Sequence, residues 1–99
     1  MLYILFYQAE GNYAERRAPY RSEHLQLAAA AHSTGDLLQG GALAEPADGA
    51  ILVFRTREAA EQFAQDDPYV VNGVVKHWSI RPWTVGVGPG ADPVPGIPR

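Results

Sequence analysis

The sequence predicts an α+β protein with the ferredoxin-like βαββαβ arrangement, in which a four-stranded antiparallel sheet carries two helices on one face. The 99 residues are 46% hydrophobic and 19% charged, as expected for one small globular domain. Short apolar runs of strand length alternate with two alanine-rich helical stretches in that order. The first and third predicted strands are also apolar on both faces, which indicates a sheet covered on both sides.

The chain begins with a predicted strand over residues 2–8, where aromatic and aliphatic residues precede a Glu-Gly-Asn turn. Residues 13–18 are predicted to be a polar connection. Pro19 then opens the first helix, because a missing amide hydrogen costs nothing at that position. We expect this helix to run to about Ser33, with Gly35 as the residue that stops it.

The first predicted helix packs through a stripe of residues at helical spacing, namely Leu25, Ala28, Ala29 and His32. Arg21 and His24 are three residues apart, so they share a face at the border of this stripe. The several alanines of the helix allow it to lie close to the sheet.

Two further strands are predicted on either side of a turn. Residues 37–43 form one strand, and Gly40-Gly41 in its middle indicates a bulge or a close approach of the backbone. Residues 44–49 form a turn that contains proline and ends in Asp-Gly. Residues 50–55 form the next strand, which is apolar on both faces.

Thr56 is the predicted N-cap of the second helix, because its hydroxyl can accept an amide hydrogen of the first turn. The helix is expected to end before Pro68, and residues 70–73 to add a single turn. Its buried side is predicted to consist of Ala59, Ala60, Phe63 and Ala64.

The fourth strand is predicted over residues 74–83, after which the composition changes. Residues 86–99 are so rich in proline and glycine that no regular element is expected there. This tail is predicted to be disordered or to lie along a partner, and the domain itself to span residues 1–85.

A homodimer is the predicted assembly. Two helices cover only one face of the sheet, whereas a face in contact with solvent should alternate with polar residues. Monomers tolerate exposed apolar patches of roughly a few hundred square ångströms, so the apolar second face requires a cover. Another copy of the chain, packed sheet to sheet, is the simplest one.

The overall charge and composition exclude several classes of partner. The formal charge is −3 and no basic run is present, so neither nucleic acid nor an anionic membrane surface is expected to bind. The absence of cysteine excludes disulfides and thiolate chemistry. The apolar start of the chain lacks a basic region and is too short to span a bilayer, so a cytoplasmic location is predicted.

No metal ion or cofactor is predicted. The three histidines form no His-x-x-x-His or Glu-x-x-His pattern, so a metal site is not supported. No glycine-rich loop joins a strand to a helix, and no serine lies in a nucleophile elbow. Acid–base chemistry by an imidazole and a carboxylate is what remains.

Asp67 is the candidate carboxylate. The proline after it forces it out of helical geometry, so its short side chain is presented rather than buried along a helix. An N-cap of the following turn is the competing interpretation. Among the histidines, His32 is expected to be structural and His77 to be structural or at the surface, which leaves His24 as the candidate imidazole.

Several short motifs occur in an order that resembles the YCII-related domain family. They are Arg21-x-x-His24-Leu25, Gly35-x-Leu37-Leu38-x-x-Gly41, Ala59-Ala60-x-x-Phe63, Asp67-Pro68-Tyr69-x-x-x-Gly73-Val74 and Ile80-x-Pro82-Trp83. The likeness covers about residues 1–84. It implies a ferredoxin-like fold that forms dimeric α/β barrels, similar to muconolactone isomerase and small monooxygenases, with a His–Asp pair as the active site.

The resemblance implies that His24 and Asp67 are the catalytic pair, with Arg21 and Tyr69 as neighbours that bind the substrate. One branch of the family acts as a dehydrochlorinase on a chlorinated hydroxyquinol, so a small cyclic or aromatic substrate is expected. The loop at residues 44–49 is shorter than in longer members, so the identity of the substrate is not carried over.

The expected reaction is an elimination or an isomerisation without a cofactor. Asp67 would orient His24, which would remove a proton beside a carbonyl or phenol, while Tyr69 or Arg21 would stabilise the oxyanion. Three alternatives stay open at this point: a small-ligand-binding or regulatory module that depends on Arg21, a cofactor-independent oxygenase, and a purely structural role.

Overall fold

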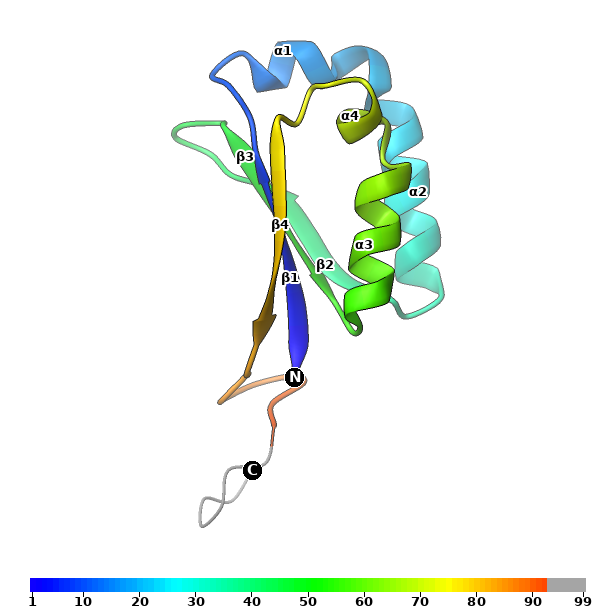
Figure 1. The fold of residues 1–99 in the computed structure, drawn as a ribbon, viewed down its shortest axis with the longest axis vertical. Coiled ribbons are helices and arrows are strands. Elements are labelled where there is room, and N and C mark those ends of the chain that lie inside the picture. The colour runs from blue at the N-terminus through cyan, green and yellow to red at the C-terminus, as the bar shows by residue number, and fades with distance from the viewer. Residues whose placement is uncertain (93–99) are drawn as a thin grey trace.

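The structure is a computed structural model whose described residues are 1–92, with one four-stranded antiparallel sheet and its helices on a single face (Figure 1). The strands are β1 (Leu2–Gln8), β2 (Leu37–Ala42), β3 (Gly49–Phe54) and β4 (His77–Trp83). The helices are α1 (Tyr13–Arg17), a 3₁₀ turn (Ala18–Tyr20), α2 (Arg21–Ser33), α3 (Arg57–Asp66) and α4 (Pro68–Val71). The strand order β2-β3-β1-β4 confirms the predicted ferredoxin-like arrangement.

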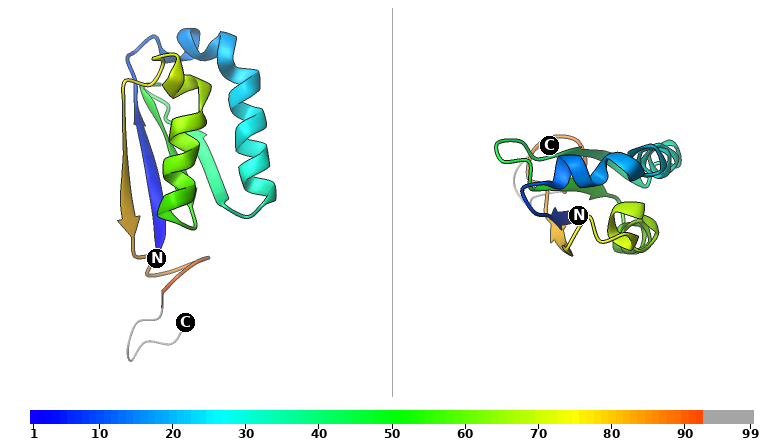
Figure 2. Two further views of the ribbon diagram at one scale, coloured as in Figure 1. Left: turned by 45° about the vertical axis from the view of Figure 1, so that its right-hand side comes forward. Right: turned by 90° about the horizontal axis from the view of Figure 1, so that it is seen from above.

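The main core lies between the sheet and the helices, and the strand register decides which residues enter it. Leu5 of β1 lies opposite Leu52 of β3 and Ile80 of β4, and successive residues point to opposite faces. Leu5 and Tyr7 are therefore buried under the helices, while Phe6 points to the other face. Figure 2 shows α2 and α3 next to each other on the helical side of the sheet.

The segment predicted as a polar connection, residues 13–18, is instead helical. α1 and the 3₁₀ turn lead directly into α2, which begins at Arg21 rather than at Pro19. Tyr13 explains the difference, because its side chain is buried and packs edge-to-face on Tyr69 with ring centroids 6.0 Å apart. This one aromatic ring anchors a segment that is otherwise mostly charged.

The buried face of α2 is displaced from the predicted stripe. The core contacts of this helix come from Leu27, Ala28 and Ala31, with His24 half-buried on the same side. The predicted stripe was wrong for three residues, which are exposed: Leu25, Ala29 and His32. Apolar residues occur on several sides of the helix, so their spacing alone does not determine which face packs. Gly35, with a φ angle of 87°, follows the end of the helix as predicted.

The helix α3 agrees with the prediction. Thr56 is its N-cap, and the Thr56 hydroxyl accepts the amide hydrogen of Ala59 at 3.2 Å. Asp67 has extended backbone angles (φ −66°, ψ 122°) and separates α3 from α4, as the proline after it requires. Ala59 is half-buried, and the fully buried residues of α3 are Ala60, Phe63 and Ala64.

The strands β2 and β4 differ in detail from the predicted ones. The register of β2 shifts between Leu37 and Gln39, so the irregularity lies before the glycine pair and not at it. Gly40 does permit a close approach, because a Cβ atom there would lie 3.1 Å from Cγ of Leu52. β4 begins only at His77, because the pair of valines at the predicted start of the strand is buried in the connection from α4.

The second face of the sheet is partly covered by the chain itself. After β4 the chain folds back, and Val85 packs with Leu2 and Val53 in a small buried cluster. Ala91 packs against the same cluster. Phe6, another apolar side chain of this face, is only half-buried.

The predicted C-terminal tail falls into two parts. Residues 86–92 form no helix or strand, as predicted. Ala91 packs on the chain's own sheet, whereas residues 86–90 are exposed. Residues 93–99, which the tail prediction also includes, lie outside the described residues. Within residues 1–92, none of the helices has the length and apolar character needed to cross a membrane.

Candidate active site

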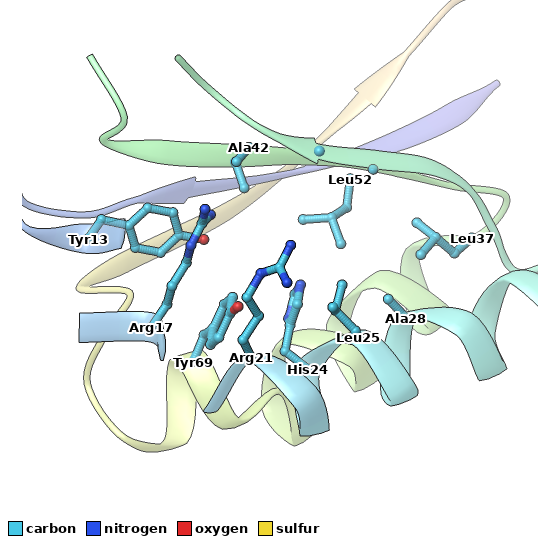
Figure 3. Close-up of a pocket in the computed structure, with 13 residues that line it drawn as sticks. Tyr13, Arg17, Arg21, His24, Leu25, Ala28, Leu37, Ala42, Leu52 and Tyr69 are labelled. Atoms are coloured by element: carbon cyan, nitrogen blue, oxygen red, sulfur yellow. The ribbon is translucent and has the colours of Figure 1, made fainter. Parts of the chain in front are cut away.

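A pocket of about 260 Å³ opens between the helical layer and the β2–β3 edge of the sheet (Figure 3). Engineered cavities of about 150 Å³ bind benzene, so a compound with a single ring fits this space. Its polar lining consists of Tyr13, Arg17, Arg21, His24 and Tyr69. Its apolar lining includes Leu25, Ala28, Leu37 and Leu52.

His24 and Asp67 lie in hydrogen-bond contact, although 43 positions separate them in the sequence. Nδ1 of His24 is 3.0 Å from Oδ1 and 2.9 Å from Oδ2 of the carboxylate. Because a carboxylate only accepts hydrogen bonds, we assign the proton of this contact to Nδ1. Nε2 makes no hydrogen bond to any residue between 1 and 92, so it is available to a ligand.

The carboxylate of Asp67 is fully buried and is held by three groups. Besides His24, the backbone amide of Tyr69 donates to Oδ1 at 3.0 Å, and the hydroxyl of Tyr7 donates to Oδ2 at 2.7 Å. The amide contact is the N-cap bond of α4. The two interpretations of Asp67, as a cap and as a neighbour of the histidine, are therefore compatible, since one carboxylate has enough lone pairs for both.

The ring of His24 is fixed by two aromatic neighbours. Tyr69 stacks on it with ring centroids 4.0 Å apart and 9° between the planes, and Phe63 meets it edge-on at 6.1 Å. The His24 side chain is only 15% exposed. Together with the bond to Asp67, these contacts hold Nε2 in one direction.

Arg21 and Tyr69, the predicted substrate-binding residues, both line the pocket. The structure adds two lining residues that the sequence analysis missed, Tyr13 and Arg17. The guanidinium carbon of Arg17 lies 5.1 Å from the centre of the Tyr13 ring. Both were missed because the segment that holds them was expected to be unstructured. An aromatic residue four positions before an arginine was the available signal for a helix there.

Tyr7 is the third group absent from the sequence prediction, and its environment is unusual. Burial, with the Asp67 carboxylate beside it, raises the pKa of Tyr7 far above the ordinary value of 10.0. Burial also raises the pKa of Tyr13 and of Tyr69. All three hydroxyls therefore remain protonated at neutral pH and can donate hydrogen bonds.

The other two histidines lie outside the pocket. Nδ1 of His32 is 2.8 Å from the carbonyl oxygen of Leu37, and His77 is exposed in β4. In the part of the chain that the structure describes, no three His, Cys, Asp or Glu side chains gather into a group that could hold a metal ion.

Comparison with known proteins identifies the family. The family model of the YCII-related domain matches residues 1–84. The chain belongs to the YCII-related domain family. This YCII-related domain is 32% identical over 94 residues to the protein YciI of Escherichia coli O6:H1, an alignment that covers 84% of this chain and 96% of that protein. Protein YciI of Shigella flexneri matches with the same 32% identity and the same coverage.

A solved structure also resembles this YCII-related domain. It is 5-chloro-2-hydroxyhydroquinone dehydrochlorinase (TftG) from Burkholderia phenoliruptrix AC1100, in complex with 2,5-dihydroxybenzoquinone. The TM-score is 0.70, and the match covers 93% of this chain and 100% of that chain. At 16% sequence identity, the likeness establishes the fold.

Proposed function

We propose that this protein is a small-molecule enzyme that uses His24 and Asp67 for acid–base chemistry without a cofactor. It would act as a lyase or an isomerase on a small cyclic or aromatic substrate. The observation that carries the proposal is the contact between the histidine and a buried carboxylate at the wall of a pocket of single-ring size. Such paired ionisable groups beside a cavity are typical of functional sites.

In the proposed reaction, Nε2 of His24 removes a proton either from a carbon beside a carbonyl or from the hydroxyl of a phenol. The electron pair of the broken C–H or O–H bond leaves negative charge on oxygen, where Tyr69 or Arg21 stabilises it. In an isomerisation, the imidazolium returns the proton to a different carbon. In an elimination such as a dehydrochlorination, the electron pair expels the leaving group as an anion. Asp67 holds the imidazole in its orientation and stabilises the imidazolium.

Two comparisons support this proposal. The chain belongs to the YCII-related domain family, and the structural neighbour TftG is a dehydrochlorinase in complex with a quinone. A ring with oxygen substituents, like that quinone, suits the size and polar lining of the pocket. The proposal includes a cytoplasmic location and a homodimer packed through the open face of the sheet.

The test of the proposal is the variant His24→Ala, assayed with chlorinated hydroxyquinol and lactone substrates. We expect kcat to fall by about 10²- to 10⁴-fold, which is the usual contribution of a general base. His77→Ala is the matched control, because it removes an exposed histidine outside the pocket. Thermal unfolding of His77→Ala should resemble that of the native chain. His24→Ala should unfold at a lower temperature, because the buried Asp67 carboxylate loses one of its hydrogen-bond donors, so it is assayed at a temperature where it is still folded. Unchanged turnover in His24→Ala would rule out the catalytic role.

The second candidate function is a small-ligand-binding or regulatory module that performs no chemistry. The two arginines at the pocket favour it, because positive side chains bind an anionic ligand whether or not a reaction follows. It predicts that the native chain binds ring compounds without converting them, and that Arg21→Gln weakens binding more than His24→Ala does. Calorimetric titration of the three proteins with one compound, followed by analysis of that compound for conversion, separates the two functions, because only an enzyme converts it.

A further inference from the structure

The pocket has a positively charged end and an apolar end, with His24 between them (Figure 3). Tyr13, Arg17 and Tyr69 gather at the first end, and the side chain of Arg21 lines the pocket and points toward the sheet. The apolar end is formed by Leu25, Ala28 and Leu37.

No carboxylate balances the two arginines inside the pocket. None of the lining residues is Asp or Glu, and Asp67 is fully buried with its oxygens occupied by their hydrogen-bond donors. Considering residues 1–92, neither Arg17 nor Arg21 forms an ion pair with an acidic side chain. The whole chain carries a formal charge of −3, so this concentration of positive charge is opposite to its overall composition.

The neighbouring arginine, Arg16, shows what a structural role looks like in this segment. Its guanidinium group donates to the carbonyl oxygen of Gly73 at 3.0 Å and so ties α1 to the connection after α4. Arg17 instead lies over the Tyr13 ring, and Arg21 makes no hydrogen bond in the described chain. Both side chains extend from the helical layer toward the sheet, so an anion bound between them would lower the repulsion between their like charges.

The tyrosines at this end add hydrogen-bond donors. Figure 3 shows the hydroxyl ends of Tyr13 and Tyr69 on the side of the arginines. Burial raises the pKa of both hydroxyls, so they stay protonated and can donate. A ligand group that carries negative charge and accepts several hydrogen bonds satisfies such a site, whereas a neutral hydrocarbon ring does not.

We infer that the ligand of this pocket is a small organic anion with one flat ring, whose anionic oxygens bind Arg17 and Arg21 and whose ring extends toward the apolar end. Carboxylates and acidic enols or phenols share this chemistry, and the forked donors of arginine bind two oxygen atoms of such groups at once. A ring carbon next to the anionic group then lies nearest to His24. This last step rests on the proposed function, whereas the binding of an anion does not.

The experiment is a calorimetric titration of the native chain with benzoate and with benzamide, which have nearly the same shape and differ in charge. We expect benzoate to bind about tenfold more tightly or better, the gain expected from a charge-assisted pair. A third titration uses 4-nitrophenolate, whose absorbance reports its ionised form. The tighter of the two anions shows whether the site prefers a carboxylate or a phenolate.

Variants locate the charge preference within the pocket. The double variant Arg17→Gln with Arg21→Gln should bind benzoate and benzamide equally, while Arg16→Gln should keep the preference. Arg16→Gln is the matched control, because it removes the same charge one position away from the pocket. His24→Ala should also keep the preference.

Three results would overturn the inference: equal affinity of the native chain for benzoate and benzamide, no binding of either anion, or a preference that survives in the double variant. Anion binding without any turnover would count against the proposed catalysis and leave the inference standing. Turnover of a neutral substrate with no preference for anions would support the proposed catalysis and count against the inference of anion binding.

Discussion

The side chain of Tyr7 determines how Asp67 is held, although Tyr7 does not line the pocket. A fully buried carboxylate must be satisfied by hydrogen bonds or lose much of its stability. Tyr7 donates to Oδ2 of Asp67, the same oxygen that lies closest to Nδ1 of His24. Its bond fixes the plane of the carboxylate and, through it, the imidazole, so Tyr7 is a positioning residue.

The variant Tyr7→Phe should change how the stability of the protein depends on pH. Unfolded chains ionise tyrosine near the ordinary pKa of 10.0, whereas burial and Asp67 keep folded Tyr7 protonated above that value. The folded state then holds more protons than the unfolded state, so the free energy of unfolding falls as pH rises through this range. In Tyr7→Phe we expect a shallower alkaline decline, and a loss of about 1–3 kcal/mol at neutral pH from the missing hydrogen bond.

Urea unfolding at a series of pH values between about 8 and 11 measures both effects. An alkaline decline as steep as that of the native chain would show that Tyr7 is not the group responsible. A neutral-pH stability equal to the native value would show that Asp67 does not depend on its hydroxyl.

Local rules made His24 and Asp67 candidates and the family resemblance implied that they pair, whereas neither indicated the part played by Tyr7. A proline fixes where Asp67 leaves the helix, and elimination among three histidines leaves His24. Tyr7 stands in an apolar strand where an aromatic residue indicates burial only, and 60 positions separate it from its acceptor. A contact over such a distance depends on how the elements pack together.

Among the elements, β2 contributes the least side-chain material and yet forms a wall of the pocket. Gly40 and Gly41 both line it, and their backbone leaves space that larger residues would fill. The two positions are not equivalent. A Cβ atom at Gly40 would lie 3.1 Å from Cγ of Leu52, whereas one at Gly41 would meet no atom within 4 Å.

Gly40→Ala should weaken binding of a ring compound, whereas Gly41→Ala should not. The added methyl group requires Leu52 to move by a few tenths of an ångström, and Leu52 itself lines the pocket. We expect benzoate affinity to fall about tenfold in Gly40→Ala as the apolar space shrinks. Calorimetric titration of the two single variants measures the difference. Equal affinities would show that this strand does not limit the size of the ligand.

The positions of strands and helices were predictable where a residue strongly prefers one place in the secondary structure, such as a helix N-cap. Thr56 capped α3 as expected because its hydroxyl suits that position. The first helical region was less predictable, because its anchors are distant in sequence: Tyr13 packs on Tyr69, and Arg16 donates to the carbonyl oxygen of Gly73. The packing face of α2 was predicted wrongly. Its alanines lie on several sides, so contacts with the rest of the fold, and not the spacing of apolar residues, determine which side is buried.

The proposed assembly depends on the second face of the sheet, the face that the helices do not cover. The fold-back of the chain after β4 buries Leu2 and Val53 at one end of this face. Phe6 lies on the same face outside that cluster and is only half-buried. The apolar area that remains is the basis for the proposed homodimer, which stays a prediction.

The variant Phe6→Arg should convert the proposed homodimer into a monomer, as measured by sedimentation velocity. A charge at the centre of an apolar sheet face is not tolerated between two packed copies. Val71→Arg is the matched control, because it makes the same type of change at a side chain that is 67% exposed on α4. A native chain that sediments as a monomer at all concentrations would contradict the proposed assembly.

Asp67 makes two kinds of contact, with the backbone of α4 and with His24, and this has a consequence for mutations at its codon. The same carboxylate caps α4 and contacts the imidazole, so a substitution there would alter folding and, under the proposed function, the chemistry as well. A glutamate would displace both oxygens by one methylene group and disturb both contacts. If random variants were sorted once for cellular abundance and once for catalytic output, the proposed function predicts that substitutions of His24 lose more in the second sort than in the first, while substitutions of Asp67 lose in both. Under the proposed function, two selective pressures oppose drift at this codon.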